Sequence, residues 1–206
     1  MDLALSLAWA VLVGLQLATV LAAPTAVGVV LVGTNALVGG LFLLRRPAAA
    51  TIRGWDLLLV PVGLFLPLLW RAAVVSEGGA APAASLLAAV PEGLAAAVEL
   101  AGALVTVWAV VALGRSFGLF PADRGLVTGG PYRLVRHPMY LAQALTGLGV
   151  CLAGGPAALS WNWPLWGAFV LVQAVRAVRE ERVLRPDPAY QSYAARVRWR
   201  LLPGVW

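Results

Sequence analysis

The chain has 206 residues, of which 61% are hydrophobic and only 12% are charged, and its mean hydropathy is +0.86. This composition is too apolar for a water-soluble domain of that length, and it indicates that a membrane is the solvent of the protein. All fifteen basic residues are arginines, and the formal net charge is +6. No polar linker interrupts the chain, so we expect one compact bundle.

Stretches long enough to cross a bilayer follow one another along the chain. A helix that crosses the hydrocarbon core needs about 20 mostly apolar residues. Stretches of this kind occupy residues 3–22, 26–44, 57–75 and 93–113. Two shorter apolar stretches, residues 139–153 and 164–178, flank a Gly154-Gly155-Pro156 break that predicts a tight connection between paired helices. We therefore predict an all-α, polytopic transmembrane bundle of about six spans.

The arginines predict the orientation of this bundle, because cytoplasmic loops attract basic residues. With six spans, only Arg71 falls on one side of the membrane. The other side holds Arg45, Arg46, Arg53, Arg115, Arg124, Arg133, Arg136, Arg176, Arg179, Arg182, Arg185, Arg196, Arg198 and Arg200. Five or seven spans would divide this set between the two sides. We therefore expect both termini, and a cofactor pocket built from the C-terminal third, at the cytoplasmic face.

A polar loop rich in glycine and proline begins at Gly114 and leads to His137 and Pro138, where the fifth span begins. Pro138 suits the first turn of a helix, whose backbone N–H groups lack partners within the helix and favour anionic ligands. His137 is the only histidine and Cys151 the only cysteine, so the chain offers no zinc ligand set and we expect no metal. Taken alone, His137 is also compatible with a purely structural polar residue at a helix entry.

Charged residues return where the sixth span ends. Arg176 and Glu180 are one helical turn apart, as are Glu181 and Arg185. One interpretation makes them ordinary surface pairs worth a few tenths of a kcal/mol. The other turns them inward, where a guanidinium can hold a carboxylate and Glu180 can hold a cation or a ligand hydroxyl.

An ordered set of short motifs decides between these interpretations. The motifs are Gly130-Pro131-Tyr132, Arg136-His137-Pro138-Met139-Tyr140, and Glu180-Glu181-Arg182-Val183-Leu184 followed by Tyr190 and Tyr193. Together, over residues 114–203, they resemble the isoprenylcysteine carboxyl methyltransferase family. The chain departs from the pattern at residues 185–189, where it reads Arg-Pro-Asp-Pro-Ala and many members have Phe-Gly.

The resemblance implies an integral membrane enzyme that takes S-adenosyl-L-methionine from the cytosol and methylates a lipophilic carboxylate arriving from the bilayer. It places the cofactor on Arg124, Gly125, Leu126, Val127, Tyr132, His137, Pro138, Met139, Tyr140 and Glu180. It makes Arg176 the residue that contacts the acceptor. Residues 1–113 then form the N-terminal spans, and residues 114–206 form the methyltransferase region with its helical hairpin and cytosolic tail helix. Membrane lipids are expected partners and nucleic acid is not.

Other functions stay open at this point. A phospholipid N-methyltransferase would need a base, for which Glu181 or a tyrosine is the candidate. A membrane reductase of the sterol-reductase type would use NADPH, although no Gly-x-Gly-x-x-Gly segment is present. A non-enzymatic protein could use its arginines to bind anionic lipid headgroups. Glu99, an acid within the fourth span, is either a functional group or a residue near the outer interface.

Overall fold

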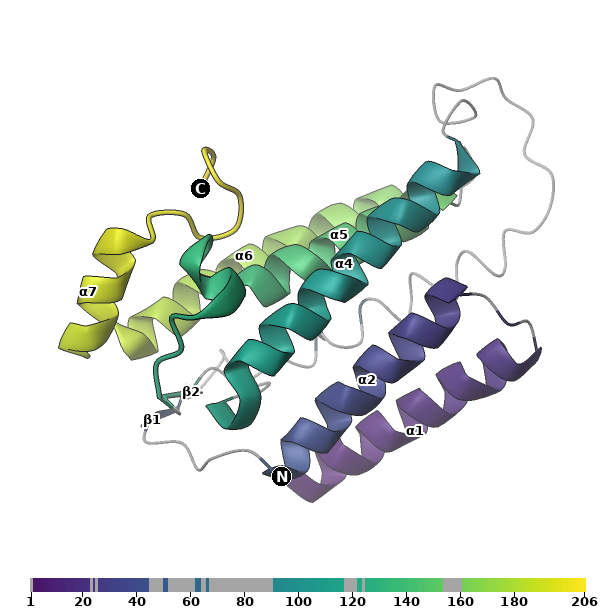
Figure 1. Cartoon of the computed structure of the whole chain (residues 1–206), viewed down its shortest axis with the longest axis horizontal. Coiled ribbons are helices and arrows are strands. Elements are labelled where there is room, and N and C mark those ends of the chain that lie inside the picture. Colours follow the sequence, from purple (N-terminus) through teal and green to yellow (C-terminus); the bar gives the residue numbers. More distant parts are fainter. Residues whose placement is uncertain are drawn as a thin grey trace.

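The structure is a computed structural model in which long helices run side by side (Figure 1). It describes residues 2–22, 24, 26–44, 50–51, 62–63, 66, 91–116, 122–123, 125–153 and 161–206. The long helices are α1 (Asp2–Ala22), α2 (Ala26–Leu44), α4 (Glu92–Leu113), α5 (Pro138–Ala153) and α6 (Asn162–Leu184). The short elements are η2 (Gly114–Ser116), η3 (Gly130–Arg133), α7 (Pro188–Arg196) and the strands β1 (Ala50–Thr51) and β2 (Ala122–Asp123), which pair antiparallel. Apart from this short pairing, the described residues confirm the all-helical class.

The helices lie where the apolar stretches predict them. Helix α2 coincides with its predicted stretch, and α1 and α4 each begin one residue before theirs. Helix α6 is longer than predicted at both ends, because it starts at Asn162 and continues through the charged segment to Leu184. The third predicted span and the Gly154-Gly155-Pro156 connection lie outside the described residues, except for positions 62, 63 and 66.

One helix in the described part of the chain, Gly93–Leu113, is both long and apolar enough to cross a membrane. The segments Trp9–Ala22, Gly28–Gly40 and Pro138–Ala153 are apolar but shorter. Helix α4 also exposes large apolar side chains, among them Leu104 and Val111, as a lipid-facing helix does and a soluble core helix does not. The number of spans and the orientation of the bundle remain predictions.

Small residues let α4 and α5 approach closely. A Cβ added at Gly149 would lie 2.6 Å from the backbone nitrogen of Glu99, and one added at Gly102 would lie 2.8 Å from the carbonyl oxygen of Ala142. Glycine at such contacts allows backbones of neighbouring membrane helices to meet. Glu99 is half-buried at this contact. The close packing fixes the position of α5 along α4. It therefore also fixes the position of the segment at which α5 begins.

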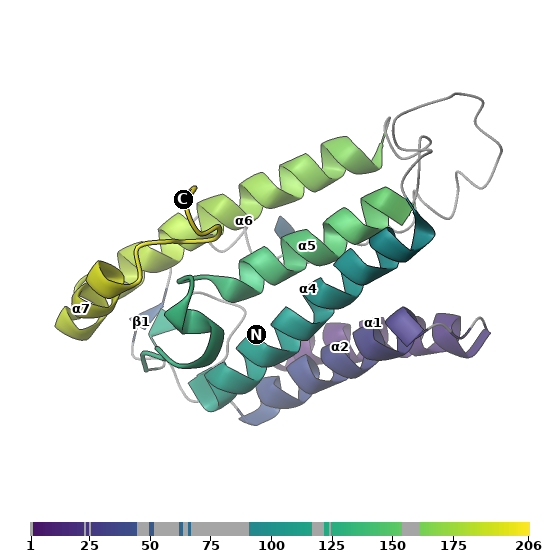
Figure 2. The same cartoon turned by 45° about the horizontal axis from the view of Figure 1, so that its top comes forward.

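One end of the bundle collects the elements that carry the sequence motifs. Helices α2, α4 and α6 finish at this end and α1 and α5 start there, and β1, β2, η3 and α7 gather around it (Figures 1 and 2). The C-terminal segment returns to the same end. The fold thus brings the entry to α5 and the exit from α6 together, although they are separated by a helical hairpin.

Candidate functional site

The segment that enters α5 is contacted from two sides, by α4 and by α7. Gly130 opens η3 with a φ of 57°, and a Cβ there would lie 3.1 Å from Ala112 Cβ on α4. Such a φ favours glycine. On the other side, the Tyr193 hydroxyl of α7 donates a hydrogen bond of 2.8 Å to the Tyr132 carbonyl. The loop between η3 and α5 is therefore anchored to both α4 and α7.

The C-terminal segment continues this support. The backbone N–H of Arg136 donates to the Trp199 carbonyl, and that of His137 donates to the Arg200 carbonyl, each at 2.9 Å. Arg200 is itself held over the ring of Trp206, with Cζ 5.0 Å from the ring centroid. These contacts fix the backbone from which the His137 side chain projects.

His137 lies between two carboxylates of α6. Its Nε2 is 3.2 Å from Glu181 Oε1, and its Nδ1 is 3.6 Å from Glu180 Oε2. The Tyr140 hydroxyl donates a hydrogen bond of 2.9 Å to the same Glu180 oxygen. The His137 and Tyr140 rings are stacked, with centroids 5.5 Å apart. The predicted cofactor residues His137, Tyr140 and Glu180 therefore form one contact group.

These contacts shift the pKa values of residues that lie beyond the predicted spans. Burial opposes the charged form of His137, but hydrogen bonds and the charges of Glu180 and Glu181 outweigh it and raise the pKa of His137 above its ordinary value. Burial likewise opposes ionisation of Glu180, yet the hydrogen bond and charge of His137 lower the pKa of this carboxyl. The contacts therefore favour the protonated form of His137 and the ionised form of Glu180.

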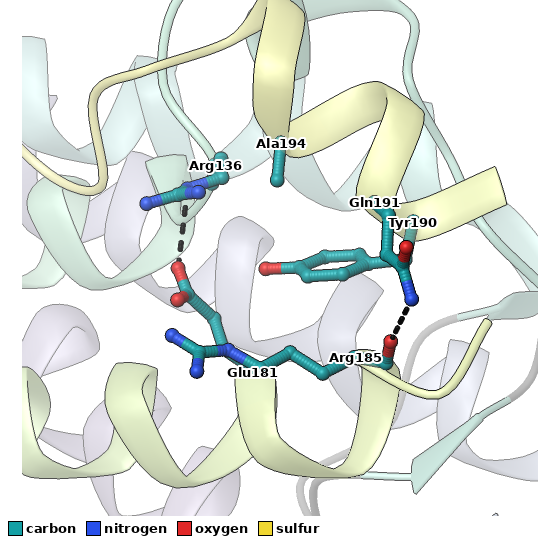
Figure 3. A pocket seen from close by; sticks show the side chains of 6 residues that line it. All are labelled: Arg136, Glu181, Arg185, Tyr190, Gln191 and Ala194. Atoms are coloured by element: carbon teal, nitrogen blue, oxygen red, sulfur yellow. Dashed lines mark hydrogen bonds and ion pairs between the residues drawn. The ribbon is translucent and has the colours of Figure 1, made fainter. Parts of the chain in front are cut away.

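Glu180 and Glu181 have different surroundings although they are adjacent. Glu181 has a side chain only 3% exposed, and it pairs with Arg136 at 3.1 Å (Figure 3). It also pairs with Arg200 at 3.1 Å and contacts His137. Burial opposes its ionisation, but His137 and these two guanidiniums lower its pKa. Glu180 is 29% exposed, and its contacts with His137 and Tyr140 both use Oε2. Glu181 therefore links α6 to the segment before α5 and to the C-terminal segment. The carboxylate of Glu180 is partly exposed, so it is accessible to a ligand.

Arg176 lies one turn before Glu180 and points into the bundle. The residue is 6% exposed, and its Cζ is 4.9 Å from the centroid of the Tyr140 ring. Its Nη1 donates a hydrogen bond of 2.8 Å to Gln173 Oε1. Gln173 in turn donates from Nε2 to Gln143 Oε1 on α5. The interpretation of Arg176 as an ordinary surface charge is therefore wrong.

The remaining predicted cofactor residues fall near this group. Leu126, Val127, Tyr132 and Met139 pack in one hydrophobic cluster with Tyr190 and Tyr193 of α7. Gly125 has a φ of 99°, and Pro138 is buried at the first position of α5. Arg124 lies outside the described residues. Within the described part of the chain, the predicted set is gathered at one end of the bundle, between α5, α6 and α7.

The departure at residues 185–189 has a simple structural role. The Asp187 side chain accepts a hydrogen bond of 2.8 Å from the Ala189 backbone N–H, and Pro188 is the first residue of α7. Asp at the N-cap and Pro at the first helical position are favourable choices for starting a helix. Residues 185–189 therefore start α7 at Pro188, and α7 places Tyr190 and Tyr193 against the segment that holds Tyr132 and Met139.

A cavity of about 400 Å³ lies between α6 and α7. It is lined by Arg136, Glu181, Arg185, Tyr190, Gln191 and Ala194 (Figure 3). The Tyr190 hydroxyl points toward the space beside Arg136 and Glu181. Among the residues that the structure describes, none of the predicted cofactor residues lines this cavity. It adjoins the predicted site through Glu181 but lies on the α7 side of it.

Sequence reasoning overlooked several residues of this region. Gln143 and Gln173 carry polar amides within apolar stretches. Because polar side chains in membrane helices usually face the bundle interior and bond across helices, these two positions could have been predicted to take part in the site. Arg200 gave no local signal, because its contact with Glu181 depends on the path of the C-terminal segment. Gly63 could not be connected with Arg176 from the sequence, although a Cβ there would lie 2.9 Å from Arg176 Nη1.

Comparisons with known proteins address the same part of the chain. No curated protein and no solved structure matches it. Residues 93–186 match the model of the family described as phospholipid methyltransferase. The matched region includes α4, η3, α5 and α6 with both glutamates, and it stops before α7. This family belongs to the same membrane methyltransferase superfamily as the isoprenylcysteine enzymes, and its usual methyl donor is S-adenosylmethionine. In residues 93–186 the chain is thus similar to the phospholipid methyltransferases, which indicates a membrane methyltransferase.

Proposed function

We propose that this chain is an integral membrane, S-adenosylmethionine-dependent methyltransferase that methylates the carboxylate of a lipophilic acceptor. The observation that supports this proposal is the placement of Arg176. Its guanidinium lies over the Tyr140 ring, whose hydroxyl binds the accessible carboxylate of Glu180. A cation suited to an acceptor carboxylate is therefore adjacent to the group proposed to hold the cofactor.

The residues present fit the cofactor chemically. Glu180 has an accessible carboxylate that suits the ammonium group or a ribose hydroxyl. Leu126, Val127, Tyr132 and Met139 offer an apolar and aromatic surface for the adenine. His137, just before α5, and Tyr140, in its first turn, fix Glu180. When bound, S-adenosylmethionine supplies a methyl group on a sulfonium sulfur.

The protein's own contribution is positioning. A carboxylate is already ionised at neutral pH, so the chain has no proton to remove from it. Arg176 orients the acceptor, while the His137–Tyr140 segment and Glu180 fix the cofactor. Because both reactants are held in reactive geometry, the methyl transfer becomes an effectively unimolecular step. Charge disappears as the anion meets the sulfonium, so a water-poor site favours the transition state over the separated ions.

The family match also fits phospholipid N-methylation, in which an ammonium must first lose a proton. The candidate bases are poorly suited to this task. Glu181 is buried between two guanidiniums and has a lowered pKa. Burial raises the pKa of Tyr132, of Tyr190 and of Tyr193, so these tyrosines stay protonated. The Tyr140 hydroxyl already donates its proton in a hydrogen bond to Glu180. These features favour carboxylate methylation over amine methylation.

The proposal includes the setting of the site. We place it at the cytoplasmic face of a multi-pass bundle, because the arginine-rich segments of the described chain gather at the end that holds α7. Residues 1–113 supply the N-terminal spans, and residues 114–206 supply the methyltransferase region. More specifically, we propose that this region is of the isoprenylcysteine carboxyl methyltransferase type.

A labelling experiment tests this function. The full chain in lipid nanodiscs is given methyl-labelled S-adenosylmethionine with a prenylated cysteine, a fatty acid or phosphatidylethanolamine. We expect label that alkali releases as methanol, because methyl esters hydrolyse and N-methyl groups do not. Alkali-stable label on phosphatidylethanolamine would assign amine methylation instead. Absence of label from every acceptor, despite a folded chain, would contradict the methyltransferase assignment.

A further inference from the structure

Two glutamines connect Arg176 to helix α5, and the mechanism above does not use them. Gln173 is 1% exposed, and its amide oxygen accepts the hydrogen bond from Arg176 Nη1. Its amide nitrogen donates to Gln143 Oε1. A buried amide is costly unless both its ends are hydrogen-bonded. Gln173 meets this requirement by linking the guanidinium on its own helix to the neighbouring helix.

The guanidinium is also confined by what surrounds it. The Tyr140 ring covers it at 4.9 Å. At Gly63, a Cβ would lie 2.9 Å from Arg176 Nη1 and 3.4 Å from Gln173 Oε1. A distance below 3.0 Å requires a neighbour to move, so glycine at position 63 leaves the space that Arg176 occupies. Tyr140, Gln173 and Gly63 together restrict the guanidinium to one place.

We propose that Gln143 and Gln173 are positioning residues that hold Arg176 as the binding group for an anionic acceptor headgroup, and so select a carboxylate over an ammonium. The inference rests on the proposed function and adds a direction of selectivity to it. A fixed, planar guanidinium can give two parallel N–H bonds to a carboxylate. An ammonium headgroup would meet a fixed positive charge in surroundings of low dielectric, where repulsion is strong.

Leucine variants of the two glutamines test the role. Gln173→Leu and Gln143→Leu remove the hydrogen bonds at similar volume, and Gln191→Leu, at an exposed position of α7, makes the same chemical change away from Arg176. We expect the KM for a prenylated cysteine to rise about tenfold or more in Gln173→Leu, which loses a hydrogen bond to a charged group, and by a smaller factor in Gln143→Leu, which loses a bond between neutral amides. The Kd for S-adenosylhomocysteine should stay within about twofold of wild type in all three, because the cofactor contacts are unchanged.

Two further variants keep the test informative where a leucine variant does not fold. Gln173→Glu retains an oxygen for Arg176 Nη1 but adds a charge that competes with the acceptor. It also removes the donor to Gln143 Oε1, and it should raise the KM for the carboxylate acceptor. Gly63→Ala should also raise this KM by displacing the guanidinium. Gly167→Ala, on α6, should have no effect, because no atom of the described residues outside its own helix backbone lies within 4 Å of the added Cβ.

The outcomes separate this inference from the function on which it rests. A wild-type chain that methylates no acceptor contradicts the proposed function. An active wild type whose acceptor KM is unchanged in Gln173→Leu and Gln173→Glu overturns the inference alone. Loss of S-adenosylhomocysteine binding in these variants also overturns it, because the glutamines would then serve the cofactor pocket. An equal rise in KM for phosphatidylethanolamine and for the carboxylate acceptor overturns the selectivity.

Discussion

The Tyr140 hydroxyl donates a hydrogen bond of 2.9 Å to the carboxylate of Glu180, forty residues further along the chain. This bond joins the first turn of α5 to the last turns of α6 and orients the carboxylate that we assign to the cofactor. The contact is a consequence of the helical hairpin, which returns α6 to the end of the bundle where α5 starts (Figure 2).

Removing either partner of this bond should weaken cofactor binding. We expect Glu180→Ala and Tyr140→Phe each to raise the Kd for S-adenosylhomocysteine about tenfold or more, because a hydrogen bond to a charged group contributes about 1.5 to 3 kcal/mol. Isothermal titration calorimetry measures this change. Arg182→Gln, at an exposed position of the same helix turn, is the control. An unchanged Kd in Glu180→Ala would remove Glu180 from the cofactor pocket.

The neighbouring carboxylate should matter for folding instead. Glu181→Ala leaves Arg136 and Arg200 without their shared partner in a buried position, and loss of one partner from a buried ion pair costs about 3 to 5 kcal/mol. Thermal unfolding in detergent should therefore show a larger fall in Tm for Glu181→Ala than for Glu180→Ala. Equal Tm values for these two variants would contradict the distinction between the adjacent glutamates.

The C-terminal segment should slow the amide hydrogen exchange of Arg136 and His137, in the loop before α5. We expect Arg200→Ala to release this segment from Glu181 and Trp206, so that the amide hydrogens of Arg136 and His137 exchange faster with solvent. Hydrogen exchange followed by mass spectrometry measures the effect. Arg198→Ala, at an exposed position of the same segment, should leave the exchange unchanged. The same protection in both variants as in wild type would mean that Arg200 does not hold the loop.

Stability should depend on pH through His137. Because the folded chain raises the pKa of His137, its contribution is fully present below the unfolded pKa of about 6.5 and is lost as pH rises through the folded pKa. The lowered pKa values of Glu180 and Glu181 act oppositely, and their contribution is lost as pH falls below about 4.3. Between pH 6 and pH 9 the Tm of wild type should therefore decline more than that of His137→Gln. Parallel curves would show that His137 does not bear a charge in the folded chain.

Much of the fold could be predicted because apolar length specifies helices in a membrane protein. The bounds of α2 follow from the sequence alone, whereas α6 extends past its apolar part because Arg176 to Leu184 continue the helix inside the site. The motif residues could be assigned to one site only through a family resemblance. Periodicity does not reveal that Glu181 is buried between Arg136 and Arg200 while Glu180 stays partly exposed, since that depends on the path of the C-terminal segment.

We propose that the group around His137, Tyr140 and Glu180 holds S-adenosylmethionine and not a nicotinamide dinucleotide. Thermal unfolding of the full chain with S-adenosylhomocysteine or with NADPH distinguishes the two cofactors, because a ligand at 100 times its Kd stabilises the folded state by about 2.7 kcal/mol. We predict that S-adenosylhomocysteine raises the Tm of wild type, that this rise is reduced in Glu180→Ala, and that NADPH leaves the Tm unchanged. A rise with NADPH and none with S-adenosylhomocysteine would contradict the assignment and favour a membrane reductase.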